Sequence, residues 1–268
     1  MMAGRDFDGW TVVVTGASTG LGRAIAVDCA SRGAATVVIN YASNTEEAAA
    51  TKGLVEAAGA AGILAQGDVA DDAECHAIVE AAAESGRIDA LFNNAGTTKF
   101  ASNHADLDAV SGEDFARLYA VNVTGAFQMI RAARPLLEAA PQPGAVVNTA
   151  SVAGVLGIGS SVPYAASKGA MITMTLSLAR ALAPKIRVNA ICPGFIDTPW
   201  FGRVMPAEAL ERLRQGVAAA SPLKAASTAE DIAGAAIFFA SPAARHITGE
   251  TLMIDAGMHL GYAPLGMR

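Results

Sequence analysis

The amino-acid sequence predicts an α/β protein with a doubly wound, seven-stranded parallel sheet and helices on both of its faces. Two observations predict this class: short apolar runs rich in β-branched residues recur along the chain, and longer Ala-rich helical segments separate them. Continuous apolar runs are typical of strands buried on both faces, and their alternation with helices favours parallel strands joined by right-handed crossovers. Because no repeat, linker or low-complexity segment interrupts the alternation, we expect residues 1–268 to form a single domain.

The predicted elements follow from these runs in order. The strands are expected at Trp10–Thr15, Thr36–Tyr41, Ile63–Gln66, Ala90–Asn93, Ala145–Thr149, Ile186–Ile191 and Leu252–Asp255. The helices are expected at Leu21–Arg32, Thr45–Ala58, Asp71–Gly86, Ser111–Ala139, Pro163–Ala181 and Thr228–Ala240. Two of these helices open with the spacing of a capping box, Ser111 with Asp114 and Thr228 with Asp231. The less regular segment at about 197–222, with a short helix at Ala207–Gly216, is interpreted as a small substrate-loop insertion.

Composition and charge exclude several classes of function. With 52% hydrophobic residues among 268, the chain can bury a sizeable core. Its formal net charge of −6, without a basic cluster, argues against nucleic acid as a partner. The N-terminal segment has no apolar run of signal-peptide length, and no uninterrupted run is long enough to cross a bilayer. We therefore expect a cytoplasmic protein without a membrane partner.

The cysteines carry no sign of a metal site. Cys29, Cys75 and Cys192 are scattered along the chain, and no Cys/His spacing is typical of zinc binding. Free thiols in a reducing compartment, and no metal ion, are the expected state.

A Gly-rich turn follows the first predicted strand. It contains Gly16, Gly20 and Gly22 in the spacing G-x-x-x-G-x-G. Glycines at such a turn let the backbone approach a pyrophosphate, which then rests on the N-terminus of the following helix. An ordinary tight turn is the alternative, but the position between an apolar strand and a helix favours a dinucleotide site.

The end of the second strand bears on which nucleotide is bound. Asn40, Tyr41 and Ser43 are the candidate ribose contacts, and an acidic residue at this point would repel a 2′-phosphate. Asn40 removes that repulsion, although no Arg or Lys lies at Thr19 or between Asn40 and Asn44 to bind the phosphate. The sequence thus permits both nucleotides and favours NADP(H) over NAD(H). The alternative is that these are ordinary turn residues.

Three polar residues in the second half of the chain predict acid/base chemistry. Tyr164 and Lys168 are four positions apart, so both project from one face of a helix. An ammonium beside a phenol should lower the Tyr pKa from its ordinary value of about 10. Such a phenol can exchange a proton with an alcohol or carbonyl oxygen, which Ser151 could also hydrogen-bond from the preceding strand end.

Taken together, these features resemble the short-chain dehydrogenase/reductase family, in the branch that includes ketoacyl-carrier-protein reductases and glucose dehydrogenases. The resemblance covers residues 8–258 and implies a Rossmann-type sheet. It rests on the Gly16–Gly22 turn, Asp68-Val69, Asn93-Asn94-Ala95-Gly96, Asn122, Ser151, Tyr164-x-x-x-Lys168 and Pro193–Thr198. The chain departs from the family pattern at Asp255-Ala256-Gly257, in a long loop Thr97–Val110 that contains His104, and in the tail His259–Arg268.

The resemblance implies a role for each matching residue. Pyrophosphate and adenosine ribose are expected at Gly16, Ser18, Thr19, Leu21 and Gly22, and adenine at Asp68 and Val69. Asn94, Ala95 and Gly96 are expected beside the ribose, and Pro193, Gly194, Ile196 and Thr198 around the nicotinamide. Tyr164 is the expected general acid/base, with Ser151 orienting the reacting oxygen and Lys168 lowering the Tyr pKa and binding the nicotinamide ribose. Asn122 is expected to anchor a water between Lys168 and solvent, a solvated helix position being the alternative.

These residues predict an oxidoreductase that interconverts a ketone or aldehyde with an alcohol by NAD(P)(H)-dependent hydride transfer. The small-molecule substrate is expected between Val152–Ser161, Thr97–His104 and Trp200–Met205, whose apolar side chains suit a moderately hydrophobic ketone or alcohol. A catalytically silent NAD(P)-binding regulator or scaffold is the alternative, although it should have lost part of the acid/base set. An epimerase or dehydratase would need a larger substrate domain. The resemblance also implies a homotetramer or homodimer.

Overall fold

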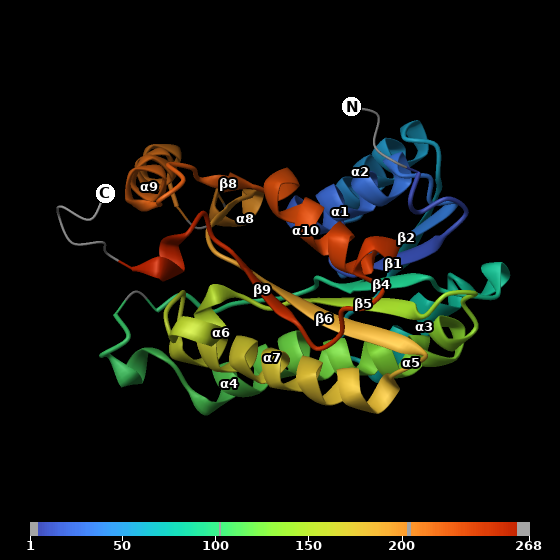
Figure 1. Cartoon of the computed structure of the whole chain (residues 1–268). Coiled ribbons are helices and arrows are strands. Elements are labelled where there is room, and N and C mark those ends of the chain that lie inside the picture. Colours follow the sequence, from blue (N-terminus) through green and yellow to red (C-terminus); the bar gives the residue numbers. More distant parts are fainter. Residues whose placement is uncertain (1–4, 102, 203–204, 262–268) are drawn as a thin grey trace.

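Seven parallel strands form one sheet in the order β3-β2-β1-β4-β5-β6-β9, which confirms the predicted class (Figure 1). The computed structural model describes residues 5–101, 103–202 and 205–261, with the backbone alone at residue 201. The strands are β1 Thr11–Val14, β2 Thr36–Tyr41, β3 Ala61–Gln66, β4 Ala90–Asn93, β5 Gly144–Thr149, β6 Ile186–Pro193 and β9 Thr251–Ile254. The order reverses between β1 and β4, so a crevice opens at the carboxyl ends of these two strands.

Helices cover both faces of the sheet. They are α1 Gly20–Ser31, α2 Thr45–Ala57, α3 Asp72–Glu80, α4 Gly112–Tyr119, α5 Ala126–Glu138, α7 Val162–Leu182 and α10 Ala229–Ala240. A further helix, α9 Ala207–Ala220, lies beyond the end of the sheet (Figure 1). Figure 1 shows α1, α2 and α10 on one face and α4, α5 and α7 on the other. Within residues 5–261, apart from the gaps, we find no helix that combines the length and apolar character needed to span a bilayer.

Alternation along each strand divides the core into two layers. In β1, Val12 and Val14 join the layer that also contains Ile25 of α1 and Ile237 of α10. Val13 points to the opposite face and joins the layer with Met129 of α5. Since both faces of the strand are buried, the continuous apolar run in the sequence is explained.

The predicted helix Ser111–Ala139 is interrupted, and the interruption positions a candidate site residue. Between α4 and α5 the chain forms a π-helical segment, η3 Ala120–Gly125. Here Gly125 packs on the β3–α3 connection, where a Cβ would lie 2.8 Å from the carbonyl oxygen of Val69. The altered turn directs Asn122 inward, and its side chain is fully buried. The alternative of a solvated helix position for Asn122 is therefore wrong.

Among the described residues, two short α-helices and two short strands were not anticipated from the sequence, and all four lie near the carboxyl edge of the sheet. They are α6 Val152–Leu156, β7 Ile196–Asp197, α8 Pro199–Gly202 and β8 Ser227–Thr228. β7 and β8 pair in parallel as a separate two-stranded ladder. The short helix expected at Ala207–Gly216 continues to Ala220, and the helix expected at Asp71–Gly86 ends at Glu80.

Candidate active site

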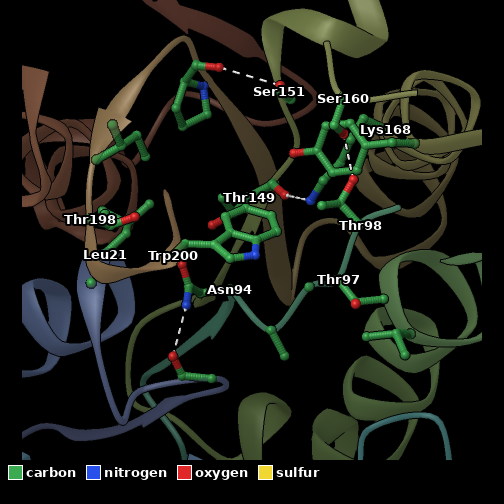
Figure 2. A pocket seen from close by; sticks show the side chains of 18 of the residues that line it. Leu21, Asn94, Thr97, Thr98, Thr149, Ser151, Ser160, Lys168, Thr198 and Trp200 are labelled. Atoms are coloured by element: carbon green, nitrogen blue, oxygen red, sulfur yellow. Dashed lines mark hydrogen bonds between the residues drawn. The ribbon is translucent and has the colours of Figure 1, made fainter. Parts of the chain in front are cut away.

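A cleft of about 810 Å³ runs along the carboxyl edge of the sheet, lined by the turns that follow β1, β2, β3, β4, β5 and β6. Every candidate site residue lines it except Gly22 and Asn122, which lie directly behind its wall. Figure 2 shows side chains from several of these segments converging on one space. Residues predicted from separate parts of the sequence are thus brought together.

The Gly-rich turn forms a tight cradle at the start of α1. Gly16 and Gly20 have φ values of +61° and +57°, in the region that favours glycine. A Cβ at Gly22 would lie 2.4 Å from the carbonyl oxygen of Gly16, so the turn closes against the helix only because that side chain is absent. No side chain caps α1, and no acidic residue occupies its first turn. Its free N–H groups suit a pyrophosphate, so the cradle fits a dinucleotide.

A second turn, after β4, is bound directly to this cradle. The Asn94 side-chain amide donates to the carbonyl oxygens of Thr15 and Gly16 at 3.1 and 3.2 Å. Figure 2 marks one hydrogen bond of this side chain. In return the Thr15 hydroxyl accepts the backbone N–H groups of Asn94 and Ala95 at 3.0 and 2.9 Å. These bonds hold the two strand ends on either side of the crevice at a set separation.

Asn40 is buried and its amide is bonded to the protein backbone. Its Oδ1 accepts the N–H of Gly16 at 3.2 Å, and its Nδ2 donates to the carbonyl oxygens of Ala65 and Gly67 at 3.1 and 3.0 Å. Asn40 therefore links the Gly-rich turn to the end of β3. Ser43, by contrast, is exposed and lines the cleft. This bracing role was not apparent from the sequence.

The charged groups that line the cleft are few. Among the described lining residues they are Asp68, Arg117 and Lys168. Arg117 on α4 was missed by sequence reasoning because its helix begins far along the chain from the nucleotide motifs; its i+4 neighbour Val121 also lines the cleft. Arg23, close to the cradle in sequence, instead donates to the Glu47 carboxylate and to the Ser18 carbonyl oxygen.

Ser151, Tyr164 and Lys168 meet where β5 ends. Ser151 is the N-cap of α6, where its hydroxyl accepts the N–H of Ala153 at 3.1 Å. Burial raises the pKa of Tyr164, and a hydrogen bond from the Ser151 hydroxyl opposes that rise. Lys168 donates from Nζ to the carbonyl oxygen of Thr149 at 2.6 Å (Figure 2) and lies 5.7 Å from the centroid of the Tyr164 ring.

The expectation that Lys168 lowers the Tyr164 pKa is wrong for this arrangement. The ammonium is directed at a backbone carbonyl and at the face of the ring, so burial decides the direction of the Tyr164 shift. The same burial lowers the pKa of Lys168 to about 8. Lys168 can therefore exchange a proton close to neutral pH.

Asn122 ties the β4 turn to α7. Its Oδ1 accepts the N–H of Thr97 at 2.8 Å, and its Nδ2 donates to the Thr97 carbonyl and the Ser167 hydroxyl, both at 3.0 Å. Gly96 lies between Asn122 and Lys168, since a Cβ there would be 3.4 Å from Asn122 Oδ1 and 3.6 Å from Lys168 Nζ. Asn122 thus fixes the backbone immediately beside the Lys168 ammonium.

Two of the segments predicted to hold substrate are fastened to each other. Ala101 N donates to the carbonyl oxygen of Ser160 at 2.8 Å, and the hydroxyls of Thr98 and Ser160 are hydrogen-bonded (Figure 2). His104 Nε2 lies 3.0 Å from the Gly159 carbonyl oxygen. In the third predicted segment, Trp200 lines the cleft and Met205 does not. Residues 203–204, like 262–268 of the tail, lie outside the described residues.

Comparison with known proteins assigns this arrangement to a family. The family model described as enoyl-(acyl carrier protein) reductase matches residues 16–259. A 3-oxoacyl-[acyl-carrier-protein] reductase of Staphylococcus aureus is 34% identical, over 93% of this chain and 98% of its own. The L-rhamnose 1-dehydrogenase (NAD(P)(+)) of a Sphingomonas species is 35% identical, over 94% of this chain and 97% of its own.

A solved structure agrees with these sequence matches. The short-chain dehydrogenase/reductase of Brucella melitensis described as a glucose/ribitol dehydrogenase has a TM-score of 0.82 at 32% identity, covering 96% of this chain and 99% of its own. The chain belongs to the short-chain dehydrogenase/reductase family of oxidoreductases. Dependence on NAD(P) is typical of such relatives.

Proposed function

We propose that this protein interconverts a ketone or aldehyde with an alcohol by NAD(P)(H)-dependent hydride transfer, with Tyr164 as general acid/base. One observation carries the proposal: the Ser151–Tyr164–Lys168 cluster and the uncapped N-terminus of α1 open into the same cleft. A nucleotide held at the cradle would therefore share one cleft with the hydroxyls of Ser151 and Tyr164. When bound, the nicotinamide cofactor supplies or accepts the hydride.

Each residue of the cluster has a defined task in carbonyl reduction. The Tyr164 hydroxyl gives its proton to the carbonyl oxygen as the carbonyl carbon gains the hydride, so the product is a neutral alcohol. Ser151 hydrogen-bonds the same oxygen and stabilises its developing charge. Lys168, whose pKa is about 8, returns a proton towards Tyr164. Asn122 holds the Thr97 backbone where a water can connect Lys168 to solvent.

The cradle residues have corresponding tasks in binding. Gly16, Ser18, Thr19, Leu21 and Gly22 bind the pyrophosphate and ribose, and Asp68 and Val69 border the adenine. Pro193, Gly194, Ile196 and Thr198 border the nicotinamide. NADP(H) is favoured because β2 ends without a carboxylate that would repel a 2′-phosphate. Competitive titration of NADPH against NADH tests this preference, and equal affinities would contradict it.

Replacing the Tyr164 hydroxyl tests the catalytic assignment. Tyr164→Phe should retain nucleotide affinity but lose about 10²–10⁴-fold in kcat, because general acid catalysis is removed and the cradle is untouched. Tyr119→Phe, the same change on α4, serves as the control and should keep wild-type turnover. We would measure nucleotide binding by fluorescence and turnover by NADPH oxidation with a panel of ketones. Nucleotide binding without turnover in the wild type would favour the regulator or scaffold.

Three wider assignments remain predictions. Residues 1–268 are proposed to form one domain, supported by the continuity of the sheet from β1 to β9. A homotetramer or homodimer is supported by Phe115 on α4 and Phe127 on α5, which are 37% and 41% exposed. Light scattering on the purified protein tests the assembly. A cytoplasmic location is a further prediction, which fractionation of cells tests.

A further inference from the structure

A second, smaller pocket opens from the catalytic end of the cleft. Its volume is about 160 Å³, and it shares five wall residues with the main cleft: Val152, Ile158, Gly194, Phe195 and Val217. Its far wall is formed by Leu156, Ala225, Ser227, Asp255 and Met258. Sequence reasoning did not anticipate it, because its wall combines α6, the end of β6, α9, β8 and the segment after β9.

The entrance of this side pocket lies beside the reacting groups. Val152 directly follows Ser151, and both line the cleft. Gly159 follows Ile158 and packs on the Tyr164 ring, since a Cβ there would lie 3.6 Å from Tyr164 Cδ1. A substrate whose carbonyl oxygen is hydrogen-bonded to Ser151 and Tyr164 therefore has one of the two substituents of its carbonyl carbon beside this entrance.

The wall of the side pocket is mostly apolar. Asp255, the one charged residue among its described lining residues, is hydrogen-bonded within its own segment. Asp255 Oδ1 accepts the N–H of Gly257 at 3.0 Å and lies 2.8 Å from His259 Nδ1. Asp255 Oδ2 accepts the backbone N–H of His259 at 2.8 Å. Because this carboxylate is bonded within its own segment, the rest of the wall consists of apolar side chains together with Gly194 and Ser227.

We propose that the side pocket selects the substrate: a carbonyl compound, or the matching secondary alcohol, that carries an uncharged apolar substituent of about the size of a six-membered carbon ring. An apolar cavity of about 150 Å³ in another protein accommodates benzene, so a pocket of about 160 Å³ suits a ring of that size. Transfer of the ring out of water supplies the binding energy. This inference rests on the proposed oxidoreductase function and narrows its substrate.

Two aliphatic ketones of similar intrinsic reactivity provide the probe. Cyclohexyl methyl ketone carries the ring, and 2-butanone carries an ethyl group in its place. For the wild type, kcat/KM should favour the ring-bearing ketone by about tenfold or more, because each buried carbon adds to discrimination. NADPH or NADH is used, according to which one the protein binds.

Filling the pocket should remove this preference. Ala225 is exposed and bonds its neighbours only through its backbone, so Ala225→Leu adds three carbons to the pocket wall without disturbing the core. We expect roughly a tenfold fall in kcat/KM for cyclohexyl methyl ketone and a change within about twofold for 2-butanone. The matched control Ala220→Leu places the same side chain on α9 outside the pocket and should keep the wild-type ratio.

A second variant enlarges the side pocket instead of filling it. Met258→Ala removes apolar wall and should also lower the ratio of the two kcat/KM values, so the proposal remains testable if Ala225→Leu fails to fold. A wild-type enzyme that turns over carbonyl compounds without preferring the ring, or a ratio equal in Ala225→Leu, Met258→Ala and the control, overturns the inference. A wild type that binds nucleotide but reduces no carbonyl compound instead contradicts the proposed function.

Discussion

Lys168 carries its charge at a site that is almost completely shielded from water. Its side chain is only 4% exposed, and its ammonium donates a hydrogen bond to the Thr149 carbonyl oxygen, which carries no full charge. The fall of its pKa from 10.5 to about 8 corresponds to a cost of roughly 3 kcal/mol for keeping the ammonium buried at neutral pH. Lys168, to which we assign a role in proton transfer, is thus expected to weaken the fold.

This cost has a defined dependence on pH. Below about pH 8, Lys168 is protonated in both the folded and the unfolded chain, so the whole cost is present. Between about pH 8 and pH 10.5 the unfolded chain binds more protons at this position than the folded chain, so stability rises with pH. Above that range both forms are neutral and the cost has disappeared.

Lys168→Met should therefore stabilise the nucleotide-free protein while abolishing turnover. The expected gain in the free energy of unfolding at pH 7 is about 1–3 kcal/mol, since the lost bond to Thr149 offsets part of it. Urea denaturation of wild type and variant at pH 7 and pH 10 measures the gain, which should shrink at the higher pH. A variant less stable than the wild type at pH 7 would show that burial of the ammonium is not the dominant cost.

At the scale of elements, α6 and α7 approach each other so closely at Gly154 that no larger residue fits there without moving the backbone. A Cβ at Gly154 would lie 2.5 Å from both the carbonyl carbon of Lys168 and the backbone nitrogen of Gly169. Those contacts are with backbone, which cannot move aside as a flexible side chain would. By contrast, the nearest atom to a Cβ at Gly169 is the Gly154 oxygen at 3.3 Å.

Gly154→Ala should displace α6 from α7 and with it Ser151 from Lys168. We expect a loss of about 1–3 kcal/mol in the free energy of unfolding and a larger relative loss of kcat than of nucleotide affinity. Gly169→Ala, on the facing helix, is the matched control and should cost less than about 1 kcal/mol. Equal effects of the two substitutions in denaturation and turnover assays would contradict the close approach at Gly154.

Local pattern accounts for which elements could be predicted. The predicted bounds of β2, Thr36–Tyr41, match the structure to the residue. Strands buried on both faces have continuous runs of apolar, β-branched residues, which are easy to detect in a sequence. The π-helical segment η3 could not be predicted, because the side-chain pattern through Ala120–Gly125 is compatible with an ordinary α-helix. The contact between Gly125 and Val69 that accompanies it joins two distant parts of the sequence. The paired strands β7 and β8 are two residues each, too short for periodicity to detect.

The residues of the candidate site likewise fall into those that could be predicted from the sequence and those that could not. Gly16, Ser151 and Tyr164 could be proposed because motifs carry their spacing within the sequence. The bracing by Asn40, the inward position of Asn122 and the presence of Arg117 in the cleft depend on contacts between distant segments. The direction of the Tyr164 pKa shift likewise depends on the burial of its hydroxyl, which sequence spacing alone does not specify.

At the scale of the whole molecule, buried Arg187 joins the end of α10 to the sheet. From β6 it donates at 2.8 Å to the carbonyl oxygens of Phe239 and Ala240, and at 3.3 Å to that of Ile247. These carbonyls include the unsatisfied C-terminal acceptors of α10, where a cation is also favoured by the helix dipole. Burial lowers the pKa of Arg187, so these acceptors compensate a charge removed from water.

Arg187→Met should leave those carbonyls unpaired and lower the free energy of unfolding by about 2–5 kcal/mol. The control is Arg134→Met, which removes an exposed ion pair with Glu138 on α5 and should cost less than about 1 kcal/mol. Guanidinium denaturation followed by circular dichroism measures both. If the two variants lost the same amount, Arg187 would not be a structural link between α10 and the sheet.

The sheet cannot be completed until β9, its outermost strand beside β6, has been synthesised. β6 is complete once Pro193 has been added, but its outer neighbour begins only at Thr251, after α9 and α10 have been made. Until then β6 presents an open strand edge of the kind that pairs with other chains. A chain whose synthesis stops within α10 therefore exposes this strand edge, and we expect it to associate with other chains more readily than the complete sheet does.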